Sequence, residues 1–237
     1  MPTPDPGTAS CRNCPIWKKS LFSSLGESDL DELQRAKAPL RFGKGEQLFG
    51  QGELATGIYC IQRGIAKVVQ KNQQGRVVMV RIAPPGDTVG HRSIFTRATF
   101  RGSARATEPL LACRVPKATL LQLLGKNTGF AQQIILRMAH DIESHERDHR
   151  NRRDKNVRER LAELLLKLID RCGEQQPDRS WKLAVQITKS DIAAMLGTAH
   201  ETAIRFVSEL KQEGVLRQEG RTLFIKDCGK LRTLVRD

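Results

Sequence analysis

Side chains between positions 200 and 205 have the chemistry to read the edges of DNA base pairs. An arginine such as Arg205 can donate two hydrogen bonds to a guanine, and a carboxylate such as Glu201 can accept one from the amino group of cytosine. An exposed isoleucine such as Ile204 suits the methyl group of thymine. The residues that we expect on this surface are His200, Glu201, Thr202, Ile204 and Arg205. The alternative is that Glu201 only caps a helix and that Arg205 is only solvated.

Residues 188–210, TKSDIAAMLGTAHETAIRFVSEL, predict the two short helices that would position these side chains. Gly197 stands between them, where a chain that ends a helix must often adopt a positive φ. The second helix has apolar residues at i, i+3, i+4 and i+7, which predicts one buried face and turns the base-reading residues outward. This pattern is typical of a helix-turn-helix. The expected capping boxes pair Thr188 with Asp191 and Thr198 with Glu201, and the expected buried face holds Ala203, Phe206, Val207 and Leu210.

The segments on either side extend this motif to a winged domain. In EGVLRQEGRTLFIKD, polar and apolar residues alternate around Glu219 and Gly220, which can adopt the positive φ angles of a tight hairpin turn. Before the motif, NVRERLAELLLKLIDRC is strongly amphipathic and predicts a further helix that begins near Asn156. Residues 156–237 therefore predict a winged helix-turn-helix domain that binds double-stranded DNA.

From Leu40 to Val115 the chain is a series of short strand-like segments such as GIYCIQ, IAKVVQK and VVMVRIA. Turn sequences such as PPGD separate them, and this spacing is typical of an all-β structure. We expect a small barrel or jelly roll with an interior ligand site over residues 21–126, preceded by a cysteine-containing segment over residues 1–20. The fold class is then α+β.

Residues 127–155 predict one long helix with a heptad seam. The seam would pair with the same helix of a second subunit, so we expect a homodimer. Two recognition helices then require a palindromic DNA site with half-site centres about one helical turn apart. The residues of the seam are Ala131, Ile135, Met138, Ile142, His145 and His149, of which the first four form the expected dimer interface.

Composition limits the remaining possibilities. The chain has 237 residues, 28% of them charged, which is enough for two modest cores. Its net charge of +14 suits an anionic partner, although residues 1–126 carry most of it, with 19 basic and 9 acidic side chains. No run of 18 apolar residues and no secretion signal is present, so we expect a cytoplasmic protein with reduced cysteines. It lacks P-loop, G-x-S-x-G and H-E-x-x-H motifs, and we expect no enzymatic activity.

The order of β-domain, long helix and winged helix-turn-helix resembles the CRP/FNR family of bacterial transcription regulators over nearly the whole chain. GEQLFGQGELATGIYCIQRGIAKV, PPGDTVG and TKSDIAAMLGTAHETAIRF carry the resemblance. It implies a cyclic-nucleotide-binding-like sensor domain, a homodimer and RNA polymerase as a partner. It also implies that Glu201 and Arg205 contact bases. His200 and Ile204 depart from the family pattern. The DNA sequence of each half-site is therefore predicted only as far as a TGA-containing core.

The same resemblance offers two kinds of sensor, the first of which uses cysteines. CRNCPIWKKS and LLACRVP are similar to the iron–sulfur region of the oxygen-sensing branch. Cys11, Cys14 and Cys113 match three of its four ligands, but Ser20 occupies the fourth position. Either a cluster is bound, with Ser20, an external thiol or nothing as the fourth ligand, or these cysteines are free thiols or a redox pair. Cys60 is assigned to the core, and Cys172 and Cys228 are given no role.

The second kind of sensor binds a cyclic nucleotide or another small anion. Family members of this kind have a Gly-Glu pair for the ribose and an adjacent Arg-Ser or Arg-Thr pair for the phosphate. Here His91 follows Gly90, and Arg101 and Ser103 are one residue apart, so the ribose carboxylate is missing. The positive charge of this region still suits an anion. The alternative function is a cyclic-nucleotide or anion-binding module that regulates a partner protein, which would leave Glu201 and Arg205 without a role.

Overall fold

The computed structural model describes residues 3–4, 10–71, 75, 77–96 and 98–235. Contacts divide the chain into two compact units. The first contains residues 1–77 and 81–143, and the second contains residues 78–80 and 144–237. The division falls within a single long helix, α4 (Thr128–Asp154), so this helix belongs half to each unit.

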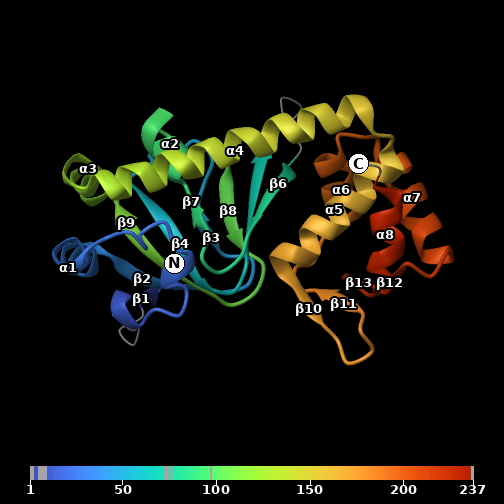
Figure 1. The fold of residues 1–237 in the computed structure, drawn as a ribbon, viewed down its shortest axis with the longest axis horizontal. Coiled ribbons are helices and arrows are strands. Elements are labelled where there is room, and N and C mark those ends of the chain that lie inside the picture. The colour runs from blue at the N-terminus through green and yellow to red at the C-terminus, as the bar shows by residue number, and fades with distance from the viewer. Residues whose placement is uncertain (1–2, 5–9, 72–74, 76, 97, 236–237) are drawn as a thin grey trace. The chain divides into compact units, whose positions relative to one another are not determined.

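The first unit is a roll of two antiparallel sheets (Figure 1). One sheet has the order β1-β2-β9-β4-β7, and the other has the order β3-β8-β5-β6. The expectation of a small barrel or jelly roll is confirmed in the form of these two sheets. The strands are β1 (Thr3–Pro4), β2 (Ala38–Phe42), β3 (Gln47–Phe49), β4 (Gly57–Arg63), β5 (Ala66–Lys71), β6 (Val77–Ala83), β7 (Thr88–Val89), β8 (Ser103–Ala106) and β9 (Leu110–Pro116).

Aromatic rings join the two sheets of the roll. Phe49 on β3 stacks on Phe100 with ring centroids 3.9 Å apart and lies 5.6 Å from the ring of Tyr59 on β4. The Tyr59 ring in turn meets Phe42 on β2 edge to face. Because large apolar side chains contribute most to core stability, this cluster fixes the two sheets against each other.

Helices cover the outside of the roll. Two short 3₁₀ helices, η1 (Cys11–Asn13) and η2 (Trp17–Lys19), precede the α-helices of this unit. Phe22, which follows them, stacks on Phe130 of α4 with ring centroids 5.4 Å apart, and both side chains are buried. The cysteine-containing segment is thereby packed against the sensor domain. The α-helices are α1 (Glu27–Ala36), α2 (His91–Thr96), α3 (Lys117–Lys126) and the first half of α4.

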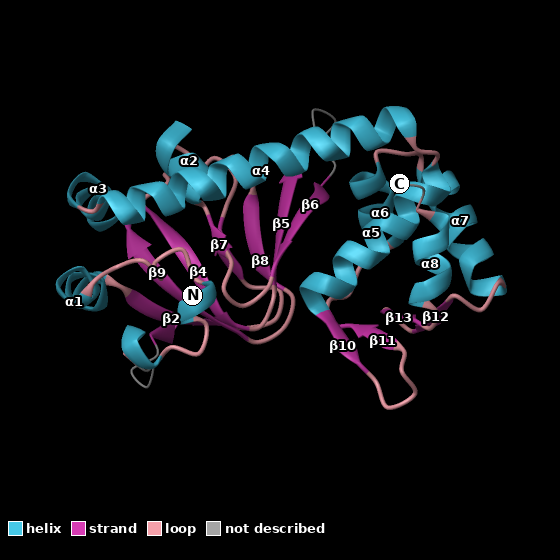
Figure 2. Ribbon diagram, in the orientation of Figure 1, coloured by secondary structure: helices cyan, strands magenta, loops and turns pink. Residues whose placement is uncertain are grey.

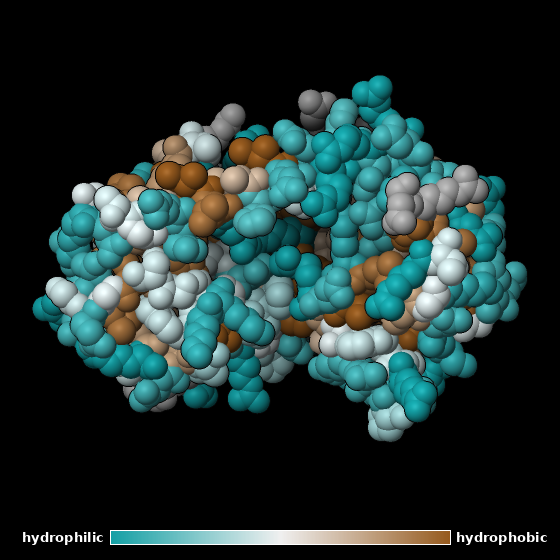
Figure 3. Space-filling view, viewed as in Figure 1, coloured by the Kyte–Doolittle hydropathy of each residue, from teal (hydrophilic) through white to brown (hydrophobic). Residues whose placement is uncertain are grey.

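The apolar face of α4 differs from the expected seam. Phe130 and Ile134 are buried in the core of the first unit, and Met138 packs against the same core. Met138 is half-buried, so its own domain covers part of the side chain, and its place in the dimer interface stays a prediction. Ile135 and Ile142 are 65% and 59% exposed, and Ala131 is half-buried. Leu136, 52% exposed, adds to the patch of apolar residues over the first half of α4 (Figure 3).

The second unit contains the helix-turn-helix (Figure 2). Its first full helix, α5, begins with a capping box in which Asn156 and Glu159 each bond the other's main-chain nitrogen. The wing is larger than expected, because its two strands extend an earlier hairpin into one sheet of order β10-β11-β13-β12. The elements are α5 (Val157–Cys172), β10 (Gly173–Gln175), β11 (Trp181–Leu183), α6 (Lys189–Leu196), α7 (His200–Gln212), β12 (Leu216–Glu219), β13 (Thr222–Ile225) and α8 (Cys228–Leu234).

None of the helices in the described parts of the chain is long and apolar enough to cross a membrane.

Candidate nucleic-acid interface and sensor sites

The helix-turn-helix begins with the expected capping box. The main-chain nitrogen of Asp191 donates to Thr188 Oγ1 at 3.0 Å, and the nitrogen of Thr188 donates to Asp191 Oδ2 at 3.0 Å. Helix α6 ends at Gly197, whose φ of +63° is in the left-handed region. A side chain at this position would also stand about 3.2 Å from the guanidinium of Arg152. The positive φ of the turn therefore favours glycine, and the Arg152 side chain would have to shift slightly to admit a Cβ.

The second expected capping box does not form. Helix α7 begins at His200 with Ala199 as its N-cap, and no side chain accepts a hydrogen bond there. The prediction that Thr198 and Glu201 cap this helix is therefore wrong. Glu201 instead lies exposed in the first turn, where its negative charge is favourable to the helix dipole. Its carboxylate is consequently available to an external hydrogen-bond donor.

Helix α7 has one buried and one exposed face, close to the expected pattern. Ala203, Val207 and Leu210 are at most 2% exposed, whereas Phe206 is only half-buried. The guanidinium of Arg205 lies 4.9 Å from the centroid of the Phe206 ring and 3.9 Å from Glu209 Oε1. The Arg205 side chain is 65% exposed, so these contacts orient it without burying it.

The five predicted DNA-contacting residues share the start and outer side of α7. His200, Glu201 and Arg205 are exposed, whereas Thr202 and Ile204 are half-buried. His200 Nδ1 lies 3.5 Å from the hydroxyl of Ser190 on α6, which connects the two helices at this surface. A guanidinium, a carboxylate, an imidazole and an apolar side chain therefore project from one side of one helix. This combination can distinguish base pairs by hydrogen bonding and by contact with thymine methyl groups.

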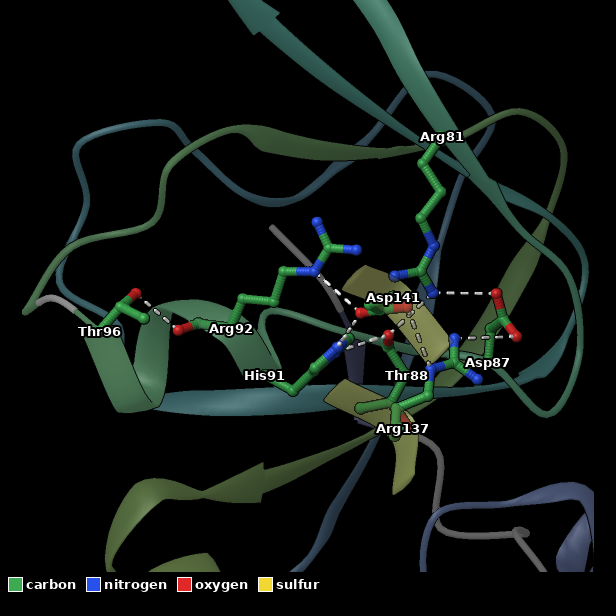
Figure 4. Close-up of polar contacts among 8 residues, drawn as sticks. All are labelled: Arg81, Asp87, Thr88, His91, Arg92, Thr96, Arg137 and Asp141. Atoms are coloured by element: carbon green, nitrogen blue, oxygen red, sulfur yellow. Dashed lines mark hydrogen bonds and ion pairs between the residues drawn. The ribbon is translucent and has the colours of Figure 1, made fainter. Parts of the chain in front are cut away.

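A partly buried polar network, with His91 at its centre, occupies the place where an anionic ligand was expected (Figure 4). His91 is 2% exposed. Its Nδ1 lies 3.1 Å from the carbonyl oxygen of Thr88, and its Nε2 lies 3.2 Å from Asp141 Oδ2 on α4. Arg92 Nε also donates to this carboxylate, at 2.9 Å. The ring of His91 therefore contacts the protein's own groups, which sequence alone could not show because Asp141 is 50 residues away.

Two more arginines complete this network. Arg81 donates to Asp87 Oδ2 at 2.9 Å and to the carbonyl oxygen of Thr88 at 3.2 Å. Arg137 on α4 lies 3.6 Å from Asp87 and 3.7 Å from Asp141. Helix α4 is thus tied by two side chains to α2 and to the turn before β7. We call Arg81, Asp87, His91, Arg92, Arg137 and Asp141 the α4 lock.

Burial and charge act in opposite directions on the α4 lock. Burial lowers the pKa of His91, and the hydrogen bond to Asp141 opposes that effect. Partial burial would raise the pKa of Asp141, but hydrogen bonds from His91 and Arg92 outweigh it and hold that pKa well below its ordinary value. Both nitrogens of His91 face oxygen acceptors, so the ring donates both bonds only when it is doubly protonated.

Replacing Asp141 by asparagine should destabilise the first unit. The change removes the negative charge that His91, Arg92 and Arg137 share, and we expect a loss of about 1–3 kcal/mol in the free energy of unfolding at pH 7. Urea denaturation of both proteins measures this loss in the free energy of unfolding. The stabilisation from a lowered carboxyl pKa is complete above the unfolded value of about 3.9 and is lost as pH falls toward the folded value. The difference between the proteins should therefore narrow below about pH 4. Glu143→Gln, an exposed change two residues further along α4, should have little effect.

The other predicted ligand residues have structural roles. Gly90 has a φ of +89°, and a side chain there would stand about 2.9 Å from the Phe100 ring. Ser103 Oγ accepts a hydrogen bond from the main-chain nitrogen of Gln51 at 3.0 Å. Arg101 is exposed, and its main-chain nitrogen donates to Ser93 Oγ on α2 at 3.3 Å. Binding of an anion by Arg101 and Ser103 stays a prediction.

The predicted cysteine ligands lie in the N-terminal turn and on β9. Cys11 is buried within η1, and Cys14 follows as its C-cap. Cys113 is on β9, directly opposite Cys60 on β4. The sequence pattern predicts Cys60 as an ordinary core residue. It is indeed buried, but the strand register also makes it a neighbour of Cys113.

Ser20 does not have the geometry of a ligand in place of the missing fourth cysteine. Its hydroxyl donates to the carbonyl oxygen of Trp17 at 2.8 Å and accepts from the main-chain nitrogen of Phe22 at 3.3 Å. It is 7% exposed, so water cannot easily replace these bonds. The suggestion that Ser20 supplies the fourth ligand therefore conflicts with the turn that this hydroxyl stabilises.

Burial and mutual proximity raise the pKa of two of the thiols. Burial raises the pKa of Cys60, and the neighbouring thiols of Cys113, Cys14 and Cys11 raise it further. Burial raises the pKa of Cys113 to about 11, with Lys37 opposing and Cys11 and Cys14 adding to the rise. Among the described residues, no group of three His, Cys, Asp or Glu side chains is arranged to hold a single metal ion. The four cysteines nevertheless share one region of the fold.

Two family profiles match the two units of the chain. The cyclic nucleotide-binding domain matches residues 39–127, and the Crp-like helix-turn-helix domain matches residues 159–234. The fumarate and nitrate reduction regulatory protein of Vibrio cholerae is 29% identical, over 94% of this chain and 89% of that protein. Electron transport regulator A of Shewanella oneidensis is 26% identical over the same fractions.

Solved structures agree with these matches. FixK2 from Bradyrhizobium japonicum has a TM-score of 0.71 at 22% identity and covers 85% of this chain and 98% of its own. TTHA1359, a transcriptional regulator of the CRP/FNR family from Thermus thermophilus, has a TM-score of 0.67 at 20% identity and covers 83% and 97%. These proteins therefore share the fold of this chain. The chain belongs to the CRP/FNR family, as a DNA-binding transcription regulator with an N-terminal sensory domain.

Proposed function

We propose that two copies of this chain read a palindromic DNA site through the exposed face of α7. The observation that carries this proposal is the division of α7 into two faces. Ala203, Val207 and Leu210 anchor the helix, while Glu201 and Arg205 project from it without a buried partner. Because the anchoring face is fixed in the core, the outer side chains enter the major groove as a rigid set.

The second copy is expected on α4. Ile135, Leu136 and Ile142 are each more than half exposed, although they lie on a helix whose opposite side is in the core. An uncovered apolar surface of this kind is typical of a protein interface. Pairing through α4 would place two copies of α7 about a two-fold axis, as a palindrome requires.

The sensor domain would act on DNA binding through the same helix. Arg137 and Asp141 join α4 to the sensor roll, so a signal that changes the roll can bias the position of α4. We propose that the protein responds in this way in the cytoplasm and passes the signal to transcription through RNA polymerase. Its relatives are regulators of fumarate and nitrate reduction and of electron transport, which supports a redox-linked signal.

The direct test selects DNA from a pool of random duplexes with the purified full-length protein. We expect a two-fold symmetric consensus, and we expect affinity for it to fall steeply as salt rises because phosphate contacts release counterions. Measurements at several salt concentrations separate this electrostatic contribution from base recognition. A pool that yields no consensus would contradict sequence-specific binding. A consensus without two-fold symmetry would contradict the symmetric dimer.

A further inference from the structure

Strand register brings together two thiols that are far apart in the sequence. Cys60 on β4 and Cys113 on β9 are directly opposite in an antiparallel pair. Directly opposite side chains point to the same face of a sheet, with Cβ atoms about 4.5–5.5 Å apart. One face of this sheet therefore carries an adjacent pair of thiols.

The N-terminal turn brings two more thiols close to this pair. Gln62 is two residues beyond Cys60 on β4, where the register with β9 shifts between Ile61 and Arg63. The Nε2 of Gln62 donates to the sulfur of Cys14 at 3.8 Å, which places Cys14 over this end of the sheet. Cys11 is held in the same turn, because the nitrogen of Cys14 donates to the Cys11 carbonyl oxygen at 3.2 Å. Cys11 and Cys60 also belong to one hydrophobic core.

A further hydrogen bond fixes this turn to the sensor domain. The main-chain nitrogen of Cys11 donates to Gln34 Oε1 on α1 at 2.7 Å. The turn is thus held in place by α1 at Cys11 and by β4 at Cys14, and Cys60 and Cys113 are close enough to interact with both of its thiols. By contrast, Ser20 is engaged in its own turn through Trp17 and Phe22.

We propose that Cys60 is the fourth ligand, with Cys11, Cys14 and Cys113, of an iron–sulfur cluster on this face of the roll. This inference refines the proposed redox-linked signal by naming its ligand set. A four-iron cluster binds each thiolate through a different iron, so its ligands are spread more widely than those of one ion. A four-iron cluster at these cysteines is therefore compatible with the finding that no group of three such side chains, among the described residues, could hold a single metal ion. Thiolate ligands are also the donors that iron–sulfur clusters select.

A ligand-exchange reaction tests the proposal without an added oxidant. The full-length protein is incubated anaerobically with a synthetic four-iron, four-sulfide cluster that carries four alkyl thiolates. Each cysteine thiol replaces one alkyl thiolate and gives it a proton, so four free alkyl thiols are released. After desalting, iron, acid-labile sulfide and visible absorbance are measured. We expect about four iron and four sulfide per chain, as for a complete cluster.

Matched variants assign the fourth ligand. Cys60→Ala should lose at least half of the bound iron, whereas Ser20→Ala should keep it. Cys172→Ala, which also truncates a buried thiol but lies in the other unit, controls for the loss of a core cysteine. Cys60→Ser, which is nearly isosteric, controls for folding and should also lose iron or show an altered spectrum. Circular dichroism of each metal-free variant verifies that it is folded.

Three results would overturn the proposal. The wild-type protein could take up no cluster, or the Cys60→Ser variant could hold the cluster with an unchanged spectrum. The Ser20→Ala variant could also lose the cluster. The measurement is independent of DNA. A protein that selects a palindrome but takes up no iron would therefore refute the ligand set and leave the proposed DNA binding intact.

Discussion

Replacing Ile135 and Ile142 together by aspartate should convert the protein to a monomer. Both side chains are more than half exposed in the single chain, so the change should cost the fold of each chain little. In a dimer that is paired through α4 it would bury four unpaired carboxylates, each at a cost of several kcal/mol. Sedimentation equilibrium measures the mass directly. We expect affinity for the selected palindrome to fall by about 100-fold or more, because one half-site must then bind alone.

A change outside α4 controls for the added charge. Leu121 on α3 is also an exposed apolar residue, at 45% exposure, and Leu121→Asp should leave both mass and DNA affinity close to those of the unaltered protein. A Leu121→Asp variant that also dissociated would place the interface elsewhere, as would a persistent dimer in the double variant.

Replacing Arg205 by alanine should weaken binding to the selected site by about 1–3 kcal/mol, which is roughly 5- to 150-fold. The loss on random duplex should be much smaller, because a base contact contributes only where the correct base is present. Fluorescence anisotropy with both duplexes measures the two losses. The fold should survive, since the Arg205 side chain is 65% exposed.

Arg205→Lys separates base reading from simple charge. Lysine keeps the positive charge but cannot form the planar pair of hydrogen bonds that arginine makes with guanine. We expect it to lose most of the discrimination between the two duplexes while the salt dependence stays nearly unchanged. Equal losses on specific and random DNA for the alanine variant would show that Arg205 contacts the backbone only.

The helix-turn-helix was predictable because its signals are local. The Thr188–Asp191 box, Gly197 and the apolar spacing of α7 depend on residues within about one or two turns of each other. The incorrect second box, between Thr198 and Glu201, concerns the helix start, where a shift of one or two residues changes the partners. The domain order followed from the same local periodicities.

Long-range contacts could not be derived in this way. The pairing of Cys60 with Cys113 depends on strand register, and the contact between His91 and Asp141 joins a short helix to α4 across 50 residues. Periodicity also could not show which stripe of α4 the sensor roll covers, or that Met138 packs partly against that roll. Sequence patterns identify which side of an element is apolar, but only the fold determines what covers it.

The spacing of the two half-sites tests the central claim, that two α7 helices read one palindrome, most directly. Five base pairs are inserted at the centre of the selected site, which moves one half-site to the opposite face of the duplex, because a helical turn takes about 10–10.5 base pairs. We predict that affinity falls to that of a duplex with one half-site. Affinity that is unchanged by the insertion would contradict a symmetric dimer whose recognition helices bind together.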